Sequence, residues 1–515
     1  MTFNTAIRVD SSMQIGTGHF MRCLTLADEL KRRGGQIRFV SRHIPVHMID
    51  TLRSRGHEFV QLDSTQCGVA TDALVHSHWL GVSQAQDSEE TIQALSDKDW
   101  DWLVVDHYAL DARWEKVLRQ VAKSILVIDD IADRQHDCDL LLDQNFYSNM
   151  DSRYKGKIPE YCRLLLGPRY ALLRDEFRKI REQIKPRSGP VNRVFVFFGS
   201  VDIGNYTGCT IDALSGLDIS DIHVDVVIGV QHPFREQIES ACARYEFACH
   251  VQTDKMAELM AQADLAIGAG GSATWERCCL GLPTLVIGTA NNQQRQIADA
   301  AREGLIYSPD LTDDLFHLVH RHLISFMENS FMRYAISRND IQSVDGLGTV
   351  RVIRNLEDLT QGERCETYAN VRLAVDDDAI LAWPWRNNEA TRRYSFDPHP
   401  VKLETHLAWW KQSLSNPNRV LLVGRLGGED VGVIRYDLVG ARQAKVSIYL
   451  KPEMTGLGIG KKLLKVSRDW LLQNHPEIDT VIAEVIPGNI SSLNAFRAVG
   501  FQEQHMLLLW KGSQK

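Results

Sequence analysis

The chain has 515 residues, of which 44% are apolar and 24% are charged, and its formal net charge is −8. That length exceeds one ordinary core and predicts roughly two to four domains, while the negative charge argues against a general nucleic-acid-binding protein. The opening residues lack a signal-peptide pattern, no window holds about 18 uninterrupted apolar residues, and the ten cysteines form no C-x-x-C pair, so we expect a cytoplasmic protein with reduced thiols and no membrane span.

Strand and helix patterns alternate in the first third of the chain. Residues 5–10 (TAIRVD) predict a short strand, and residues 19–33 carry apolar side chains at helical spacing until two glycines end the pattern. Further buried strands are predicted at residues 36–41, 101–106, 124–129 and 138–145. This alternation is typical of a parallel sheet with crossover helices.

A second round of the same alternation begins near Arg193. Its strand-bearing segments are residues 193–202, 222–229, 264–283 and 284–290. Residues 167–190 look like a helical connector, and a helical tail at about residues 315–355 closes this part. We therefore expect two successive Rossmann-like lobes, residues 1–165 and 166–358.

The character of the chain changes near Gly362, where residues 359–368 predict a polar linker. Strand patterns follow, together with a glycine-rich turn that opens a helix. Residues 369–515 therefore predict a separate mixed α/β domain.

Residues 15–23 (IGTGHFMRC) place His19 where a glycine turn meets a helix. Free amides and a positive dipole at a helix start hold anions, and glycines let a ligand come close. The same dipole favours the neutral imidazole, which is the form that acts as a general base. On this short pattern alone, a histidine that only caps or packs is the commoner outcome.

A second glycine turn at a helix start supports a ligand-binding role for the first one. Gly270, Gly271 and Ser272 open another helix and could face a diphosphate, while Glu276 in that helix could accept ribose hydroxyls. Residues 289–296 follow the next strand, at the edge of a parallel sheet where ligands bind. Two lobes with one glycine loop each describe an enzyme that holds a nucleotide between them.

Several separated motifs, in this order, resemble the UDP-sugar hydrolases of pseudaminic acid synthesis, which act on UDP-2,4-diacetamido-2,4,6-trideoxy-β-L-altropyranose. The matching segments are residues 8–30, 104–115, 165–177, 197–205, 268–287 and 291–293. The resemblance covers about residues 5–355 and implies a GT-B-type fold, related to the lipid II-forming N-acetylglucosaminyltransferase. Ser200 departs from the pattern, because the family often has a second glycine there.

The resemblance implies hydrolysis with inversion at the anomeric carbon, with His19 deprotonating or orienting the attacking water. Amides near Gly16, Gly18, Gly270 and Gly271 are then the donors that stabilise the leaving diphosphate. The other implied contacts to the nucleotide sugar are Arg8, Asp10, Arg22, Asp106, Tyr108, Ser272, Glu276, Asn292 and Gln293. For Arg8, Asp10, Arg22, Asp106 and Tyr108, a purely structural role is the alternative. No metal is expected.

Residues 454–464 (MTGLGIGKKLL) follow a strand and open a helix, so their amides could hold a pyrophosphate. With residues 489–501 downstream, this arrangement resembles the GNAT acetyltransferases and implies acetyl-CoA as co-substrate. The implied coenzyme contacts are Ile448 and Leu450 on the strand, Leu457, Gly458, Ile459, Gly460 and Lys461 in the loop, and Asn489. Two positions depart from the family: Thr455 replaces the usual Gln or Arg, and Phe496 replaces the tyrosine that often protonates the thiolate.

Glu484 is our candidate base for the attacking amine, and Tyr449 offers a further hydroxyl. Residues 383–410 resemble the acceptor-side segment of acetyltransferases that modify nucleotide-linked amino sugars, with Arg386, Asn387 and His406 as possible contacts. A half-buried helix histidine is the alternative for His406.

The two resemblances together imply a bifunctional enzyme of pseudaminic acid synthesis. The C-terminal domain would N4-acetylate a UDP-4-amino-4,6-dideoxy-sugar, and the N-terminal lobes would then hydrolyse the product. Sequence patterns leave the sugar stereochemistry and the oligomeric state open, so a legionaminic-type precursor is one alternative. Another is a glycosyltransferase, or a binding module without turnover, fused to a protein acetyltransferase; a transferase would need an acceptor and release little free sugar.

Overall fold

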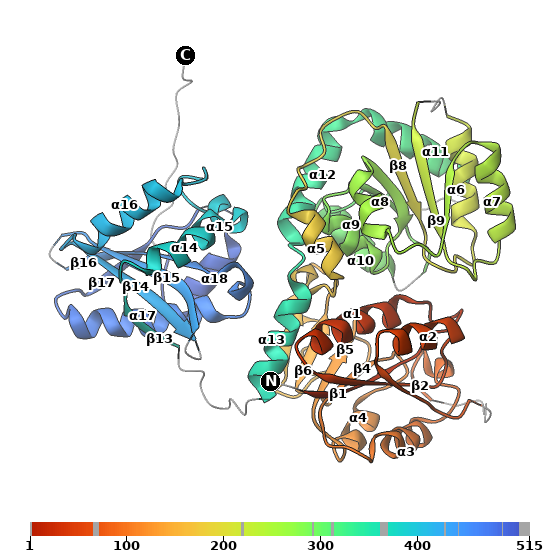
Figure 1. The fold of residues 1–515 in the computed structure, drawn as a ribbon, viewed down its shortest axis with the longest axis horizontal. Helices are drawn as coiled ribbons and strands as arrows, with labels where there is room; N and C mark the ends of the chain where they lie inside the picture. Colours follow the sequence, from red (N-terminus) through yellow and green to blue (C-terminus); the bar gives the residue numbers. More distant parts are fainter. Residues whose placement is uncertain are drawn as a thin grey trace. The chain divides into compact units, whose positions relative to one another are not determined.

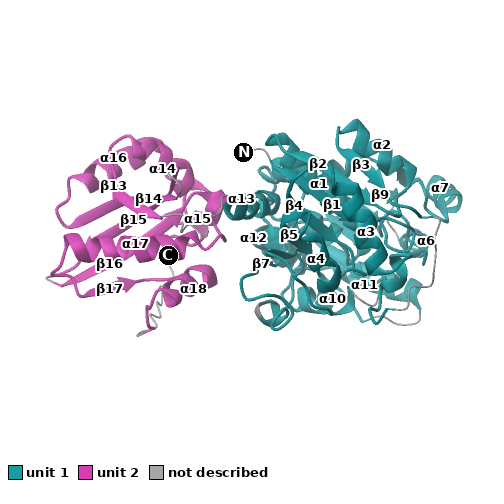
Figure 2. Ribbon diagram, turned by 90° about the horizontal axis from the view of Figure 1, so that it is seen from below, with its two compact units in different colours: residues 1–360 teal, residues 361–515 magenta. Residues whose placement is uncertain are grey.

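The computed structural model describes residues 3–503 except 65–71, 218–220, 291–292, 311–313, 361–368, 427–428, 441 and 487. The chain divides into two compact units, residues 1–360 and 361–515 (Figure 2). Most of the expected linker, residues 359–368, lies outside the described residues.

The first lobe of the first unit is built on a seven-stranded parallel sheet. Its strands, in spatial order, are β3 (Glu58–Gln61), β2 (Gln36–Ser41), β1 (Asn4–Val9), β4 (Trp100–Asp106), β5 (Ala122–Ile128), β6 (Leu140–Asp143) and β7 (Arg163–Leu166). Both faces of the sheet are covered, so alternate residues of β4 enter different cores: Trp102 and Val104 one, Leu103 and Val105 the other. That double burial is why β4 is apolar without interruption from Trp102 to Val105.

The helices of this lobe connect and cover the strands. They are α1 (Gly18–Arg32), α2 (Val46–Ser54), α3 (Gln84–Leu95) and α4 (Ala112–Leu118), with short 3-10 turns η1 (Ser77–Trp79), η2 (Met150–Ser152) and η3 (Pro168–Tyr170). The apolar stripe of α1 is buried through Phe20, Cys23, Leu24, Ala27 and Leu30, as its helical spacing predicted.

The second lobe repeats the plan with five parallel strands. Their order is β10 (Ala248–Val251), β9 (His223–Ile228), β8 (Arg193–Phe197), β11 (Leu265–Ala269) and β12 (Thr284–Ile287). The helices are α5 (Asp175–Arg181), α6 (Tyr206–Ser215), α7 (Arg235–Arg244), α8 (Met256–Gln262), α9 (Ala273–Cys279), α10 (Gln294–Arg302), α11 (Leu315–Glu328) and α12 (Ser330–Ser343). Two parallel sheets, each wrapped by helices, form the expected pair of Rossmann-like lobes (Figure 1).

The last helix of the unit, α13 (Gly348–Thr360), returns to the first lobe. Val352, Ile353 and Leu356 are buried in the same core as Phe20 and Leu24 of α1. The expected boundary placed these residues with the second lobe, but the apolar face of α13 packs into the core of the first lobe.

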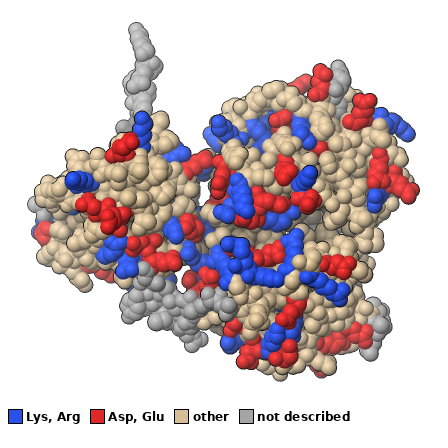
Figure 3. Space-filling view, viewed as in Figure 1, with Lys and Arg blue, Asp and Glu red and all other residues tan. Residues whose placement is uncertain are grey.

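Charged side chains of both signs are mixed on the face of the first unit shown in Figure 3. Lys and Arg gather over α1 and α5, where Arg32 pairs with Glu29 and Arg178 pairs with Asp175. None of the helices in the described part of the chain has the length and apolar content of a membrane-spanning segment.

The second unit holds a five-stranded sheet. Its strands are β13 (Asn370–Leu373), β14 (Arg419–Leu426), β15 (Glu429–Leu438), β16 (Gln443–Leu450) and β17 (Thr480–Ala483), in that spatial order. Its helices are α14 (Asp378–Asn387), α15 (Glu389–Arg393), α16 (Leu403–Leu414), α17 (Ile459–Asn474) and α18 (Ile490–Ala498), with the 3-10 turn η5 (Pro452–Met454).

Strands β16 and β17 are parallel, whereas the other neighbours in this sheet are antiparallel. Their pairing runs from Gln443 opposite Thr480 to Val446 opposite Ala483 and then stops. Residues 447–450 of β16 remain paired with β15 alone. The sheet therefore opens between β16 and β17 just before η5 and the glycine loop.

The packing of α13 can be tested with Ile353→Ala. The side chain is fully buried, so its truncation leaves a cavity and should lower the free energy of unfolding by about 2–5 kcal/mol. Asp358→Asn, on a partly exposed position of the same helix, is the control and should change it by less than about 1 kcal/mol. Urea unfolding measures both, and equal effects would show that α13 contributes no core to the first unit.

Candidate active sites

The first site forms where adjacent strands β1 and β4 end. Val9 pairs with Asp106, so the chain leaving β1 and the last residue of β4 lie side by side. The turn after β1 reaches α1 through Gly16, whose φ of +77° suits glycine and strains other residues. His19 is the second residue of α1, and its Nδ1 lies 2.5 Å from Oδ1 of Asp106.

Arg22 holds the Asp106 carboxylate from one turn further along α1. Its Nε and Nη2 donate to the two carboxylate oxygens at 2.6 and 2.7 Å, and its Nη1 donates to Asp130 at 2.8 Å. Burial alone would raise the pKa of Asp106, but the Arg22 guanidinium and the His19 imidazole outweigh it and hold the pKa well below its usual value.

These contacts set the tautomer of His19. Nδ1 of His19 also lies 3.2 Å from Nη2 of Arg22, but its contact with Asp106 is much shorter. A carboxylate only accepts hydrogen bonds, so we assign the proton to Nδ1, which donates to Asp106. Nε2 then has the lone pair, and among the described residues it has no hydrogen-bond partner. An imidazole oriented in this way can take a proton from water.

Asp130 is a site residue that the sequence analysis did not single out. It follows β5 by two residues, accepts from Arg22 and also accepts the hydroxyl proton of Tyr108. Tyr108 is buried, with its ring edge-on to His19 at a centroid distance of 4.7 Å. Its hydroxyl is therefore engaged by Asp130, and its ring faces His19. The sequence feature that could have identified Asp130 is the pair Asp129–Asp130 directly after a buried strand.

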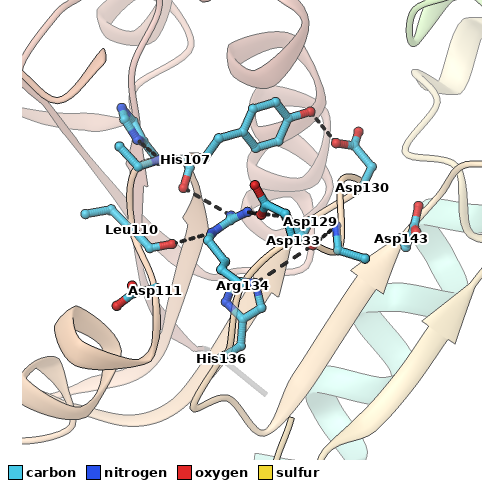
Figure 4. A network of polar contacts seen from close by, with 12 residues as sticks. His107, Leu110, Asp111, Asp129, Asp130, Asp133, Arg134, His136 and Asp143 are labelled. Carbon is cyan, nitrogen blue, oxygen red and sulfur yellow. Dashed lines mark hydrogen bonds and ion pairs between the residues drawn. The ribbon is translucent and has the colours of Figure 1, made fainter. Parts of the chain in front are cut away.

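Neighbouring Asp129 serves the fold. Arg134 lies 2.8 Å from its Oδ1 and also donates to the carbonyl of Leu110 at 2.7 Å (Figure 4). The N–H of Ala132 donates to Asp129 Oδ2 at 2.9 Å, which caps the turn after β5.

Arg8 and Asp10 lie beneath the glycine turn. Arg8 forms a bidentate ion pair with Asp10, at 2.6 and 3.1 Å, and a second ion pair with Asp87. The side chains of Arg8 and Asp10 are fully buried. Asp10 also accepts the N–H of Arg42 at 2.7 Å. In this structure the two residues fix the loop from below and do not line its surface.

The glycine turn of the second lobe faces that of the first. Thr17 Oγ1 lies 3.1 Å from Ser200 Oγ, and a Cβ placed on Gly18 would lie 3.3 Å from Ser272 Oγ. Gly18 thus permits the close approach of the two loops. The serine at position 200, where the resembled family often has glycine, makes a contact between the lobes.

The other predicted residues of this turn have separate surroundings. A Cβ at Gly270 would collide with Ile297 of α10, whereas the nearest atom to one at Gly271 is Gln293 Nε2 at 3.7 Å. Glu276 lies 3.4 Å from Arg174 and is half-buried. Asn292 lies outside the described residues.

A buried carboxyl, Asp143, ends β6 near this site (Figure 4). The Tyr154 hydroxyl donates to its Oδ2 at 3.1 Å, and Arg153 Nε lies 3.3 Å from the same oxygen. Burial and the charge of Asp130 raise the pKa of Asp143 to about 8, so this carboxyl is protonated at neutral pH.

In the second unit, the loop before α17 has an open glycine. Gly458 is the N-cap residue with φ of +71°, and nothing lies within 4 Å of a Cβ placed on it. Gly460 lies in the first turn, and Ile459 is buried, so this segment offers backbone amides to a ligand. Lys461 is exposed beside them. The open edge of β16 with Ile448 and Leu450 leads to this loop.

Other predicted residues of this unit have partners of their own. Asn489 caps α18 by accepting the N–H of Ser492 at 3.1 Å. Glu484 forms an ion pair with Lys445 at 2.6 Å. Phe496 is buried against Phe501, with ring centroids 5.0 Å apart.

The residues predicted to contact the acetyl-accepting sugar, and Tyr449 with them, fall into two groups. Asn387 donates to and accepts from Val401, at 2.7 and 2.8 Å, and so fixes the chain between α15 and α16. Arg386 Nη1, His406 Nε2 and the Tyr449 hydroxyl are buried without a hydrogen-bond partner among the described residues. Burial lowers the pKa of His406 and raises that of Tyr449, so both are neutral at pH 7.

No group of three or more His, Cys, Asp or Glu side chains within the described ranges is placed to hold a metal ion. The expectation of a metal-free enzyme stays a prediction.

Comparisons with known proteins agree with this division of the chain. Residues 370–502 match the family model described as "Acetyltransferase (GNAT) domain". Over 516 residues the chain is 22% identical to an uncharacterized protein of Methanocaldococcus jannaschii, MJ1062, and the match covers 97% of this chain and 96% of that protein.

Over 199 residues the chain is 27% identical to UDP-2,4-diacetamido-2,4,6-trideoxy-beta-L-altropyranose hydrolase of Campylobacter jejuni, covering 38% of this chain and 61% of the hydrolase. The solved structure of Acinetobacter baumannii MurG covers 69% of this chain and 99% of its own, at 14% identity and a TM-score of 0.47. The first unit thus holds two parallel-sheet lobes and is similar in part to a UDP-sugar hydrolase, and the second contains a GNAT domain.

The protonated state of Asp143 predicts a pH-dependent stability. Its pKa is about 8 in the folded protein and about 4 in an unfolded chain, so folding takes up a proton between these values. The free energy of unfolding therefore falls as pH rises through this window. Asp143→Asn cannot ionise and lacks this loss. Its free energy of unfolding, relative to that of the wild type, should therefore increase from pH 5 to pH 8 by on the order of 1 kcal/mol per pH unit.

Urea unfolding at pH 5, 6.5 and 8 measures this difference. Glu160→Gln, on an exposed residue, is the control: it keeps Asp143, so its stability should fall with pH in the same way as that of the wild type. A difference between Asp143→Asn and the wild type that stays constant across the three pH values would contradict the assignment.

Proposed function

We propose that this chain is a bifunctional enzyme of nucleotide-sugar metabolism. Its second unit transfers acetyl from acetyl-CoA to the 4-amino group of a UDP-4-amino-4,6-dideoxy-sugar. Its first unit hydrolyses the resulting UDP-2,4-diacetamido-2,4,6-trideoxy-sugar to UDP and free sugar. The observation that carries the hydrolase half is the oriented His19, held by Asp106 and Arg22 on a glycine turn that faces the second lobe.

The proposed hydrolytic step uses this geometry. Nε2 of His19 takes a proton from water as the water oxygen forms a bond to the anomeric carbon. The bond from that carbon to the diphosphate oxygen breaks, and its electron pair leaves with UDP, so configuration inverts. The positive charge that develops on His19 is stabilised by the Asp106 carboxylate. Amides near Gly16, Gly18 and Gly271 can stabilise the leaving diphosphate.

The similarity to the Campylobacter jejuni hydrolase supports this half of the proposal. It favours a sugar of the pseudaminic acid route over other nucleotide sugars. The configuration of the released sugar, read by NMR, would separate this substrate from a legionaminic-type one.

The acetyltransferase half uses the opening between β16 and β17. Acetyl-CoA can place its pantetheine arm along residues 447–450 and its pyrophosphate on the amides of the Gly458 loop. The amine attacks the thioester carbonyl, the carbon–sulfur bond breaks, and coenzyme A leaves as thiolate. Glu484 is the candidate proton acceptor and must first part from Lys445. The GNAT match over residues 370–502 supports this half.

The hydrolase half predicts that His19→Ala lowers kcat for UDP release by about 10²- to 10⁴-fold, because the general base is lost. Asp106→Asn should lower it as well, since the tautomer of His19 is no longer set by a carboxylate. UDP and free sugar are measured by mass spectrometry after adding the diacetamido UDP-sugar to the full chain. Acetylation by the same variants is the internal control and should stay at the wild-type rate. Undiminished hydrolysis in His19→Ala would reject the mechanism.

The acetyltransferase half predicts a weaker acetyl-CoA complex in Gly458→Val. A branched side chain strains the left-handed backbone and intrudes beside the amides that hold the pyrophosphate. The KM for acetyl-CoA should rise about tenfold, a loss of about 1.4 kcal/mol, while UDP-sugar hydrolysis is unaffected. Gly440→Val is the matched control, because Gly440 has φ of +78° and open space but lies in the turn after β15. Equal losses in both variants would place the pyrophosphate elsewhere.

A further inference from the structure

Three aromatic rings form a wall beside His19, and the catalytic step described above uses none of them as a chemical group. The wall consists of His76 and Trp79, at η1, and Tyr108, after β4. Trp79 stacks on Tyr108 with centroids 5.5 Å apart, and His76 contacts both rings, at 4.6 Å from Trp79 and 5.3 Å from Tyr108. Tyr108 in turn contacts His19 edge-on. The wall therefore starts at the proposed base and extends away from it.

Only part of this wall can meet a ligand. Tyr108 is 5% exposed, and its hydroxyl is already bound to Asp130. His76 and Trp79 are half-buried and present the remaining accessible ring surface. A partly exposed indole beside a catalytic histidine offers a large apolar contact area at low conformational cost.

His76 adds an unused polar atom to the wall. Its Nδ1 is buried and has no hydrogen-bond partner among the described residues. Burial lowers the pKa of His76, while the charge of Asp133 opposes this shift and that of Arg134 adds to it. The imidazole is therefore neutral at pH 7 and can form one hydrogen bond through Nδ1, as donor or as acceptor. A buried polar atom without a partner costs free energy unless a ligand satisfies it.

We propose that the aromatic wall is the subsite that recognises the sugar ring of the substrate, with Trp79 packed on its apolar substituents and His76 hydrogen-bonded to an acetamido group. This inference rests on the proposed hydrolase function and deepens it. The substrate class it defines is a nucleotide-linked hexose in which hydroxyls are replaced by N-acyl and deoxy groups. The methyl groups of such a sugar suit an indole face, and an amide supplies both a donor and an acceptor for His76.

The aromatic wall and the residues proposed to bind the nucleotide lie on different lobes. The wall lies in the first lobe next to His19, whereas Gly271 and Gln293 lie on the second lobe. Loss of the wall should therefore weaken binding of the sugar and leave binding of UDP alone unchanged.

The test compares Trp79→Ala and His76→Ala with the wild type in the full chain. For hydrolysis of the diacetamido UDP-sugar, we expect KM to rise about tenfold in Trp79→Ala, equivalent to about 1.4 kcal/mol, with a smaller change in kcat. His76→Ala should raise KM less, because one hydrogen bond is lost. Trp79→Phe keeps an aromatic face and should recover most of the affinity. The inhibition constant of UDP should be the same in all variants.

Val75→Ala is the matched control, since Val75 immediately precedes His76 and its side chain is 75% exposed. It should leave KM unchanged. An unchanged KM in Trp79→Ala, or an equal rise in the inhibition constant of UDP, would overturn the subsite. If the wild type hydrolyses no UDP-sugar, the hydrolase proposal fails by itself. In that case, calorimetry measures the affinity of the protein for the diacetamido UDP-sugar and for UDP. If the wall binds the sugar, Trp79→Ala loses the additional affinity that the sugar gives over UDP. If Trp79→Ala keeps that additional affinity, the subsite is rejected.

Discussion

The first unit depends on one buried ionic interaction, the grip of Arg22 on the carboxylate of Asp106. A buried carboxylate is costly unless a cation and hydrogen bonds compensate it, and Arg22 supplies both through its planar fork. With the charge fixed in place, Asp106 can accept from His19 and set its tautomer. The same guanidinium reaches Asp130, which in turn engages Tyr108. Base, orienting group and aromatic wall are thus connected through one arginine.

The region behind Asp130 joins this site to the second lobe. Asp143 stays protonated beside Asp130, which avoids two adjacent buried charges. The chain after Asp143 then contacts the second lobe: Asn145 accepts from the indole of Trp275 at 2.8 Å, and Ser148 donates to Asp299. Asp299 lies on α10, the helix that follows Gln293. The acidic end of the first sheet and α10 of the second lobe are therefore joined by direct hydrogen bonds.

The second unit reaches its chemistry through a different constraint. A parallel strand added to an antiparallel sheet pairs with β16 for four residues only, and the remainder of β16 keeps an unpaired edge towards β17. Backbone groups on such an edge seek partners, and an extended amide-bearing ligand can supply them. The Gly458 loop follows directly. In the proposed function, the first unit uses a histidine to activate water, while the second uses backbone amides to position a coenzyme.

Local pattern was sufficient for much of this protein. The helix from Gly18, the continuously apolar strands and the glycine turns follow from periodicity and from residues that tolerate a positive φ, as Gly16 and Gly458 do. These features depend on neighbours in sequence, so the sequence by itself determined the α/β class, the repeated lobes, the separate C-terminal domain and the place of His19 at a helix start. The tertiary structure alone decided what surrounds those features, because strand order and helix return bring distant residues together. It paired Arg22 with both Asp106 and Asp130, sealed Arg8 and Asp10 beneath the loop, returned α13 to the first lobe, and placed Trp79 and His76 against Tyr108, which contacts His19. Contacts between residues far apart in sequence leave no periodic signal, and burial, which separates a supporting arginine from a binding one, exists only after folding.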